Sequence, residues 1–248
     1  MHRFFIVNLT TSDNQIVLND KKEIHHLKNV LRCKSGDPII VFNGQGVEAT
    51  GIIQSIKEQG VTVQIEKFLP STSKKILLSL ACAIPKKTKF ELIIEKCTEL
   101  GVDEIIPLKT ERTEFKYFPE RLRSKLARFQ TVALNAAKQS KQSNTPTIYS
   151  IAKFENALKA HITAQTLPLI PCLTGTRENL LSIFQHFPQN KNKILFFIGP
   201  EGDFTNHEID LAINSGCRPI SLGPTTLKVE TAAITVIATS TLFLSHEK

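Results

Sequence analysis

The spacing of apolar and polar positions changes near residue 73 of the chain. Before that point, short apolar runs alternate with turn signals about every ten residues, a rhythm typical of a small β-barrel. A helix is expected where apolar residues recur at helical spacing, over 21–31. Strands are predicted for 3–8, 15–18, 38–42, 47–56 and 61–68, and the Pro- and Ser-containing stretch 69–73 is predicted as a linker.

After residue 73 the pattern becomes an alternation of strands and helices. The continuous apolar run 76–84 is expected of a strand buried on both faces. Further strands are predicted for 104–108, 167–173, 194–198 and 219–222, with helices over 86–100, 121–140 and 206–215. This alternation is typical of a mostly parallel sheet, so the fold class is α/β, with domains at 1–69 and 74–248.

Local signals support several of these boundaries. Asn43-Gly44 is a turn signal after the third predicted strand. Thr205 and Glu208 have the spacing of a capping box, and Gly216 stands where the same helix is expected to end. The helix predicted over 206–215 is therefore bounded by residues that favour a helix start and a helix stop.

Composition narrows the class of protein. The chain has 248 residues, of which 41% are apolar and 22% charged, so it can build a sizeable core and is not a disordered or disulfide-rich chain. The most apolar stretch, 231–245, is interrupted by Thr and Ser, and the start of the chain lacks signal-peptide features. We therefore expect a cytoplasmic protein that neither crosses nor binds a membrane.

The number and spacing of the cysteines also favour a cytoplasmic protein. They are odd in number, widely spaced and without a C-x-x-C pair, which disfavours zinc ribbons and thioredoxin-like sites. We expect small buried apolar side chains and no metal. The five are Cys33, Cys82, Cys97, Cys172 and Cys217.

Positive charge is concentrated in one segment. The net charge is +8, and the range 109–141 holds nine basic residues against three acidic ones. A local excess of this size predicts a polyanionic partner, with nucleic acid first. The alternative is a helix face that is simply solvated.

Two glycine-bearing loops follow neighbouring predicted strands. Gly199-Pro200-Glu201-Gly202 comes directly after 194–198, and Leu222-Gly223-Pro224 follows 219–222. Ligands of open α/β sheets bind outside the carboxyl ends of the strands. The G-x-G-x-x-G and P-loop fingerprints are absent, which disfavours a Rossmann dehydrogenase and a P-loop NTPase. From the residues alone, the loops predict no more than a small polar, nucleotide-like ligand.

A set of longer motifs runs through the chain in order. They are His2-Arg3-Phe4-Phe5, His25-His26-Leu27, Val30-Leu31-Arg32, Gly36-Asp37, Phe42-Asn43-Gly44, Lys96, Thr98-Glu99-Leu100-Gly101-Val102, Pro107, Glu111-Arg112, Gln139-Ser140, Pro146, Gly199-Pro200-Glu201-Gly202, Leu222-Gly223 and Glu230-Thr231-Ala232. In these motifs the chain resembles the RsmE family, the 16S rRNA uracil-N3 methyltransferases of the SPOUT class.

The resemblance implies a fold and an activity. It implies an N-terminal PUA-like RNA-binding β-barrel and a C-terminal SPOUT α/β domain with a deep trefoil knot, assembled as a homodimer. It also implies an S-adenosyl-L-methionine (SAM) pocket in the knot, with no metal. The expected reaction is methylation of N3 of one uridine near the 3′ end of 16S rRNA, in the assembled small ribosomal subunit.

The resemblance also implies roles for individual residues. Lys228 and Arg112 are expected to stabilise negative charge on the uracil, and Glu230 to act as a base or to hold Lys228. Arg3, Arg32, Lys34, Arg121, Arg123, Lys138 and Lys141 are expected to contact RNA, although a plain surface role fits them as well. Cofactor contacts are expected from Leu173, Ile198, Gly199, Pro200, Glu201, Gly202, Leu222, Gly223, Leu227, Thr231 and Ala232.

The chain departs from the family pattern at three places. Asp203 stands where the family has a second glycine, and aspartate tolerates positive φ better than most residues. Lys228 replaces an arginine and keeps the charge without the bidentate fork. Gln142 follows Lys141 where an arginine is expected.

Two other functions remain open from the residues. A non-catalytic RNA-binding ribosome-assembly factor would keep the fold without binding SAM. A nucleotide enzyme acting on small molecules would show no salt-dependent affinity for RNA.

Overall fold

The computed structural model describes residues 1–70, 74–86, 89–113, 119–173 and 175–246. The predicted linker 69–73 therefore lies mostly outside the described residues. The chain forms two compact units. The first contains Met1–Ser73 and Ala137–Thr145, and the second contains Lys74–Ala136 and Pro146–Lys248.

The first unit is built on a five-stranded sheet in the order β1-β3-β4-β5-β2. Its strands are β1 (His2–Phe5), β2 (Gln15–Leu18), β3 (Pro38–Phe42), β4 (Glu48–Ile56) and β5 (Val61–Phe68). The β1–β3 pair is parallel, and the other pairs are antiparallel. All five predicted strands are confirmed within a few residues.

The helix predicted over 21–31 forms in two parts. The first is α1 (Lys21–His25), and the second is η1 (His26–Val30), a π-helical turn. At the end of the second part the Leu31 N–H bonds to the His26 carbonyl, five residues back, at 2.9 Å, which is the π-helical pattern. Ile24 and Leu27 still face the core of this unit, as the helical spacing predicts.

The segment Ala137–Thr145, which begins within the last turn of α3 (Pro119–Gln139), belongs to the first unit, whereas the rest of that helix belongs to the second. The Thr145 N–H donates to the Gly44 carbonyl at 2.9 Å, and the Gly46 N–H donates to the Ser143 carbonyl at 3.2 Å. These bonds pair the segment with the turn that Asn43-Gly44 predicts. As functional divisions, the domain ranges 1–69 and 74–248 stay predictions.

The second unit contains an eight-stranded sheet in the order β11-β13-β10-β12-β6-β7-β8, with β9 paired to β7. Every pair is parallel, which confirms the predicted α/β class. The strands are β6 (Leu77–Ala83), β7 (Glu104–Lys109), β8 (Thr147–Ile148), β9 (Ala152–Lys153), β10 (Thr166–Pro171), β11 (Glu178–Asn179), β12 (Lys193–Ile198) and β13 (Arg218–Ser221).

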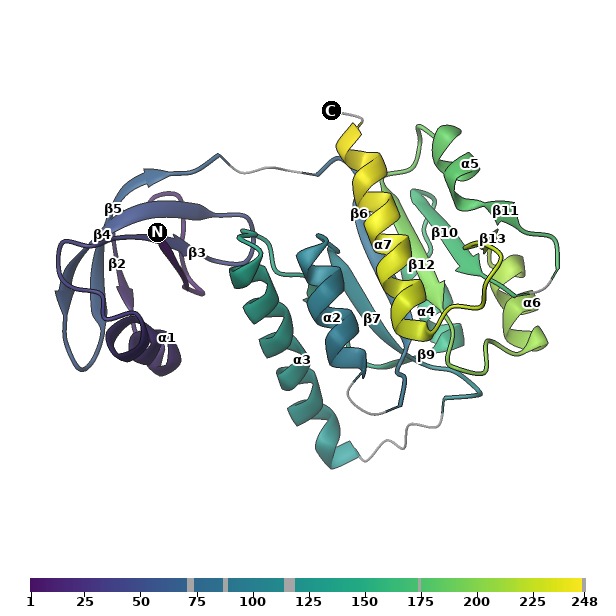
Figure 1. Ribbon diagram of the computed structural model, residues 1–248, viewed down its shortest axis with the longest axis horizontal. Coiled ribbons are helices and arrows are strands. Elements are labelled where there is room, and N and C mark those ends of the chain that lie inside the picture. Colours follow the sequence, from purple (N-terminus) through teal and green to yellow (C-terminus); the bar gives the residue numbers. More distant parts are fainter. Residues whose placement is uncertain (71–73, 87–88, 114–118, 174, 247–248) are drawn as a thin grey trace. The chain divides into compact units, whose positions relative to one another are not determined.

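Helices cover both faces of this sheet (Figure 1). The helices are α2 (Lys89–Glu99), α3 (Pro119–Gln139), α4 (Phe154–His161), α5 (Leu180–Gln185), α6 (Asn206–Asn214) and α7 (Val229–His246). One core cluster joins the sheet to α2, α3, α5 and α7, and a second joins it to α4 and α6. Side chains of β6 enter both clusters, Leu80 one and Ala81 the other, which confirms the predicted doubly buried strand.

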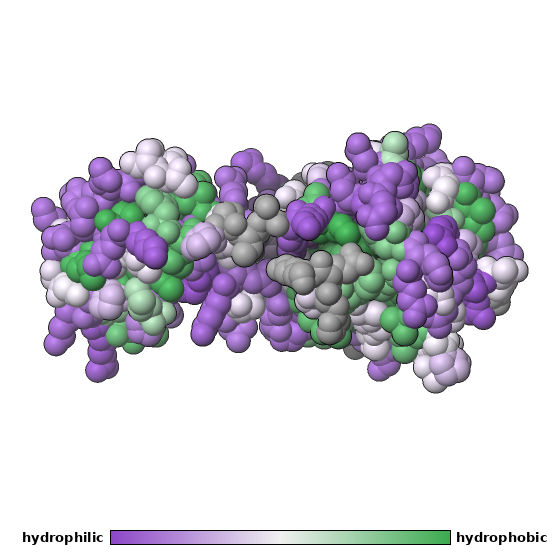
Figure 2. Space-filling model, turned by 90° about the horizontal axis from the view of Figure 1, so that it is seen from above, coloured by the Kyte–Doolittle hydropathy of each residue, from purple (hydrophilic) through white to green (hydrophobic). Residues whose placement is uncertain are grey.

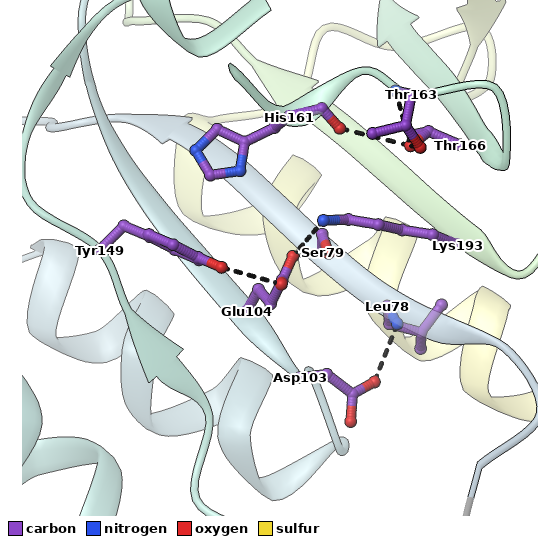
Figure 3. A network of polar contacts seen from close by, with 9 residues as sticks. All are labelled: Leu78, Ser79, Asp103, Glu104, Tyr149, His161, Thr163, Thr166 and Lys193. Atoms are coloured by element: carbon purple, nitrogen blue, oxygen red, sulfur yellow. Dashed lines mark hydrogen bonds and ion pairs between the residues drawn. The ribbon is translucent and has the colours of Figure 1, made fainter.

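A polar network lies at the amino ends of the central strands (Figure 3). The Glu104 carboxylate accepts hydrogen bonds from Ser79 Oγ at 2.6 Å and from the Tyr149 hydroxyl at 3.0 Å, and it pairs with the Lys193 ammonium. The His161 ring packs edge-on against Tyr149, with ring centroids 4.7 Å apart. Burial, together with the charge of Lys193, lowers the pKa of His161.

The surface is mostly polar on the face seen in Figure 2, with small apolar areas between charged side chains. The exposed apolar residues include Leu92 on α2 and Leu242 on α7. None of the described helices is long and apolar enough to cross a membrane.

Candidate functional site

A pocket of about 370 Å³ opens at the carboxyl ends of three parallel strands. Its walls come from the ends of β10, β12 and β13, the first residues of α7 and one side chain of α2. The two predicted glycine loops do not follow neighbouring strands, because β10 lies between β12 and β13. All three strand ends nevertheless meet in one pocket, at the edge of the sheet where α/β proteins bind ligands.

Most of the predicted cofactor residues line this pocket. They are Leu173, Ile198, Gly199, Pro200, Glu201, Leu222, Gly223, Leu227 and Ala232. The predicted Gly202 and Thr231 are next to lining residues without being among them. Lys228 lines the pocket, whereas Arg112 and Glu230 do not.

The backbone of the β12–α6 loop is tightly constrained. A Cβ at Gly199 would come within 3.1 Å of Cδ2 and 3.2 Å of the backbone nitrogen of Phe204, which is 2% exposed and packed on Phe154. Asp203 has φ of 61°, so this position does need the left-handed conformation that aspartate tolerates. On β13's side of the pocket, Gly223 has φ of 120°.

We expect Gly199→Ala to weaken ligand binding in the pocket. The added methyl must displace Phe204 or the loop, and overpacking of this kind costs about 1–3 kcal/mol. Calorimetry with the ligand of the pocket measures the loss of binding affinity. Gly36→Ala is the control, because Gly36 is in the first unit and outside the pocket lining, and a Cβ there meets nothing within 4 Å although its φ of +95° strains an alanine. Equal affinity of Gly199→Ala and wild type would contradict the expectation.

The acidic residues of this loop have different surroundings. Glu201 Oε1 accepts a hydrogen bond from the Lys86 backbone N–H at 3.1 Å, which ties the loop to the end of β6. Asp203 accepts from the Phe204 N–H at 2.8 Å. Both carboxylates line the pocket and place negative charge at its wall.

Cysteine chemistry does not contribute to the pocket. Cys172 is in its wall, and burial, with the nearby Asp203 carboxylate, raises the pKa of that thiol to about 11. Burial raises the pKa of Cys97 and of Cys217 to about 12. These two cysteines and also Cys82 and Cys172 are buried, as the sequence predicts, whereas Cys33 is only partly buried. All five are free.

Glu230 pairs with Lys89 rather than with Lys228. The Lys89 ammonium lies 3.0 Å from Glu230 Oε1, while Glu230 Oε2 is buried with no hydrogen-bond partner among the described residues. Burial by itself would raise the pKa of Glu230. Its own backbone N–H, the ammonium of Lys89 and, less strongly, the charge of Lys228 outweigh that effect and hold the pKa below its ordinary value.

Arg112 lies behind the loop and not in the pocket. Its guanidinium donates to the carbonyl oxygens of Gly202 and Phe204. The neighbouring Glu111 N–H donates to Glu208 Oε1 at 2.9 Å, in the capping box of α6. Arg112 is therefore placed to hold the loop, and its predicted contact with uracil stays a prediction.

Two cations of the pocket were not predicted from sequence. Lys89 is the first residue of α2 and one of several lysines in 86–89, so nothing in the pattern distinguishes it. Arg177 donates to the carbonyl oxygens of Cys172 and Leu173, at 3.0 and 2.8 Å. Its position depends on a loop whose path the sequence does not specify.

The predicted RNA-binding residues fall into two groups. Arg32, Lys34, Arg121, Arg123 and Lys141 are exposed. Arg3 is only 9% exposed, pairs with Glu48 and donates to the Gln142 carbonyl, and Lys138 pairs with Glu23 at 2.6 Å. For Arg3 and Lys138 the structure favours a role inside the first unit over the predicted RNA contact.

The comparisons with known proteins fit this arrangement. An RNA methyltransferase domain family matches residues 72–241, and an RNA methyltransferase PUA domain family matches 18–66. Fold and pocket thus define an RNA methyltransferase that carries a PUA domain. The chain belongs to the ribosomal RNA small subunit methyltransferase E family.

Individual relatives cover nearly the whole chain. The Rickettsia conorii ribosomal RNA small subunit methyltransferase E is 32% identical over 99% of this chain and 97% of its own length. The Bacillus subtilis protein of the same name is 28% identical, over 86% and 84%. The crystal structure of the Neisseria gonorrhoeae protein, bound to S-adenosyl methionine, is 25% identical with a TM-score of 0.86 over 98% and 97%. Membership in this family favours the enzyme over the non-catalytic alternative.

Proposed function

We propose that the chain transfers the methyl group of SAM to N3 of one uridine near the 3′ end of 16S rRNA, in the assembled small subunit. The observation that carries the proposal is one pocket, built from three strand ends, in a chain of the methyltransferase E family. The particular base and atom rest on the sequence resemblance.

The pocket fits SAM in size and chemistry. Its volume lies within the range of about 300–1,000 Å³ that small-molecule and cofactor sites occupy. Ile198, Leu222 and Leu227 supply apolar surface for an adenine ring, and the adjoining loops supply backbone amides and carbonyls. Glu201 and Asp203 place negative charge where a cationic ligand would be favoured. When bound, SAM supplies an electrophilic methyl group.

We assign to Lys228 the role of contacting the uracil. N3 of uracil must lose a weakly acidic proton before it can accept a methyl group, and negative charge then spreads to the ring's carbonyl oxygens. Lys228 is exposed at the mouth of α7 and lines the pocket, so its ammonium is placed to stabilise that charge. The N3 proton then leaves to water.

Glu230 is assigned a positioning role and not that of a base. A general base works best when its pKa is near the operating pH, and the pKa of Glu230 is held below its ordinary value. Its free oxygen is also buried, outside the pocket lining.

Transfer of labelled methyl from SAM to small ribosomal subunits that lack the modification tests the function. Naked 16S rRNA and large subunits run in parallel, and the RNA is digested to nucleosides. We expect label in 3-methyluridine, from small subunits only. Binding of SAM without label on any RNA would refute the proposed substrate, and failure to bind SAM would refute the activity.

The remaining assignments also come from the resemblance. We propose that the first unit binds RNA through exposed Arg32, Lys34 and Lys141, together with Arg121 and Arg123 on α3. The knot, the homodimer and the cytoplasmic location are proposed on the same basis. Within the part of the chain that the structure describes, no group of three or more His, Cys, Asp or Glu residues is arranged to hold a metal ion.

A further inference from the structure

Lys89 is a charged side chain of the pocket to which neither the motifs nor the comparisons assign a role. It extends from the first residue of α2 and is 37% exposed. A cation at a helix N-terminus is disfavoured by the helix dipole, so helix stability does not explain a lysine here.

The ammonium of Lys89 is fixed by Glu230. The two groups are 3.0 Å apart, and the Glu230 side chain is only 16% exposed. Glu230 is in the first turn of α7, where an acidic residue is favourable. The pair therefore joins the starts of two helices and holds a cation at the pocket wall. An ammonium has three donors, so one bond to Glu230 leaves others for a ligand.

The other cations of the pocket have different surroundings. Arg177 donates to two backbone carbonyls of the β10 end. Lys228 is assigned to the uracil by the proposed function. Among the described lining residues Lys89 is the remaining cation, in a wall that also carries the carboxylates of Glu201 and Asp203.

We propose that Lys89 binds the carboxylate of the methionine moiety of SAM, with Glu230 as its positioning residue. The proposal rests on the proposed function. SAM combines positive groups, the sulfonium and the α-ammonium, with one carboxylate. The pocket wall carries two carboxylates for the positive groups and, beside Arg177 and Lys228, the ammonium of Lys89 that Glu230 fixes for the carboxylate. A charge-assisted hydrogen bond is among the stronger polar contacts.

Two thioether ligands isolate this contact. S-adenosylhomocysteine carries the amino-acid moiety, whereas 5′-methylthioadenosine lacks it and is otherwise alike. We expect Lys89→Met to weaken S-adenosylhomocysteine binding about tenfold in calorimetry, with less than a twofold change for methylthioadenosine. Lys89→Arg keeps the charge and is expected to retain most of the discrimination. Lys159→Ala, an exposed lysine on α4, controls for the loss of one positive charge.

The role of Glu230 is tested by whether the effects of the Glu230 and Lys89 substitutions on ligand affinity add. If Glu230 acts through Lys89, the double variant Glu230→Gln/Lys89→Met binds S-adenosylhomocysteine no more weakly than Lys89→Met alone. A further loss in the double variant would overturn the positioning role.

The outcomes separate this inference from the proposed function. If the wild-type protein binds neither SAM nor S-adenosylhomocysteine, the proposed function fails. If it binds them and Lys89→Met weakens both thioethers equally, Lys89 is only structural and the inference fails. It also fails if Lys89→Met leaves both affinities unchanged, and a lower affinity for RNA in that variant would then assign Lys89 to an RNA phosphate. If Lys89→Met does not fold, Lys89→Gln takes its place, and its affinities for S-adenosylhomocysteine and methylthioadenosine decide between these outcomes.

Discussion

Replacement of Lys228 by alanine is expected to lower kcat for methyl transfer to small subunits about 100- to 1,000-fold. Removal of one group that stabilises charge in the transition state has an effect of this size in other enzymes. The affinity for SAM should change little, because the proposed partner of Lys228 is the uracil. Single-turnover kinetics on undermodified small subunits, together with calorimetry for SAM, measure the two quantities separately.

Lys228→Arg is the matched control for this prediction. Arginine keeps the positive charge, so we expect activity within about tenfold of wild type. Folding is not at issue, since the side chain is exposed and the Ala232 N–H bonds to the backbone carbonyl of Lys228, which alanine keeps. Full turnover by Lys228→Ala would remove the residue from the mechanism.

Replacement of Lys193 by methionine is expected to destabilise the protein by about 1–3 kcal/mol at neutral pH. Lys193 and Glu104 are 16% and 18% exposed, so removal of the ammonium leaves a mostly buried carboxylate with only its neutral partners. Those partners are the hydroxyls of Ser79 and Tyr149. Urea unfolding of wild type and variant measures the difference.

The destabilisation should depend on pH in a defined direction. Burial would raise the pKa of Glu104, but the hydrogen bonds from Lys193, Ser79 and Tyr149 outweigh it and lower the pKa below its ordinary value. The stabilisation is therefore complete above the unfolded-state pKa of about 4.3 and is lost as pH falls through the folded-state value. We expect the difference between wild type and Lys193→Met to be largest near pH 7 and to shrink in acid.

Lys191→Met is the control for this pair. Lys191 is two residues away, and its ammonium donates to the exposed Ala164 carbonyl at 2.8 Å. A surface substitution of this kind changes stability by about 0.5 kcal/mol or less. A pH-independent loss in Lys193→Met would show that the lost packing of the lysine stem, and not its charge, is responsible.

Local sequence signals predicted the secondary structure well where they act over a few residues. The strand 15–18 and the Thr205–Glu208 capping box are both present in the structure. The helix over 21–31 was predicted as one element and forms as two, because one carbonyl pairs five residues along instead of four. The strands β8, β9 and β11 were not predicted, since two residues each are too few to show an apolar pattern and both residues of β11 are polar.

The part of the site that was predicted also follows from local signals in the chain. Gly199, Glu201 and Gly223 are in loops that directly follow predicted strands, and chain order alone places such loops at the carboxyl edge of a parallel sheet. Lys89 and Arg177 reach the pocket from other segments. Their places depend on strand order and loop path, which no local pattern specifies.

The sequence by itself determined the α/β class, the change of architecture near residue 73 and the family, because periodicity and ordered motifs are properties of the chain alone. Only the tertiary structure decided which charges meet. It placed β10 between β12 and β13, paired Glu230 with Lys89 instead of Lys228, and set Arg3 and Lys138 inside the first unit. Such pairings join residues far apart in sequence, so they follow from packing and not from spacing.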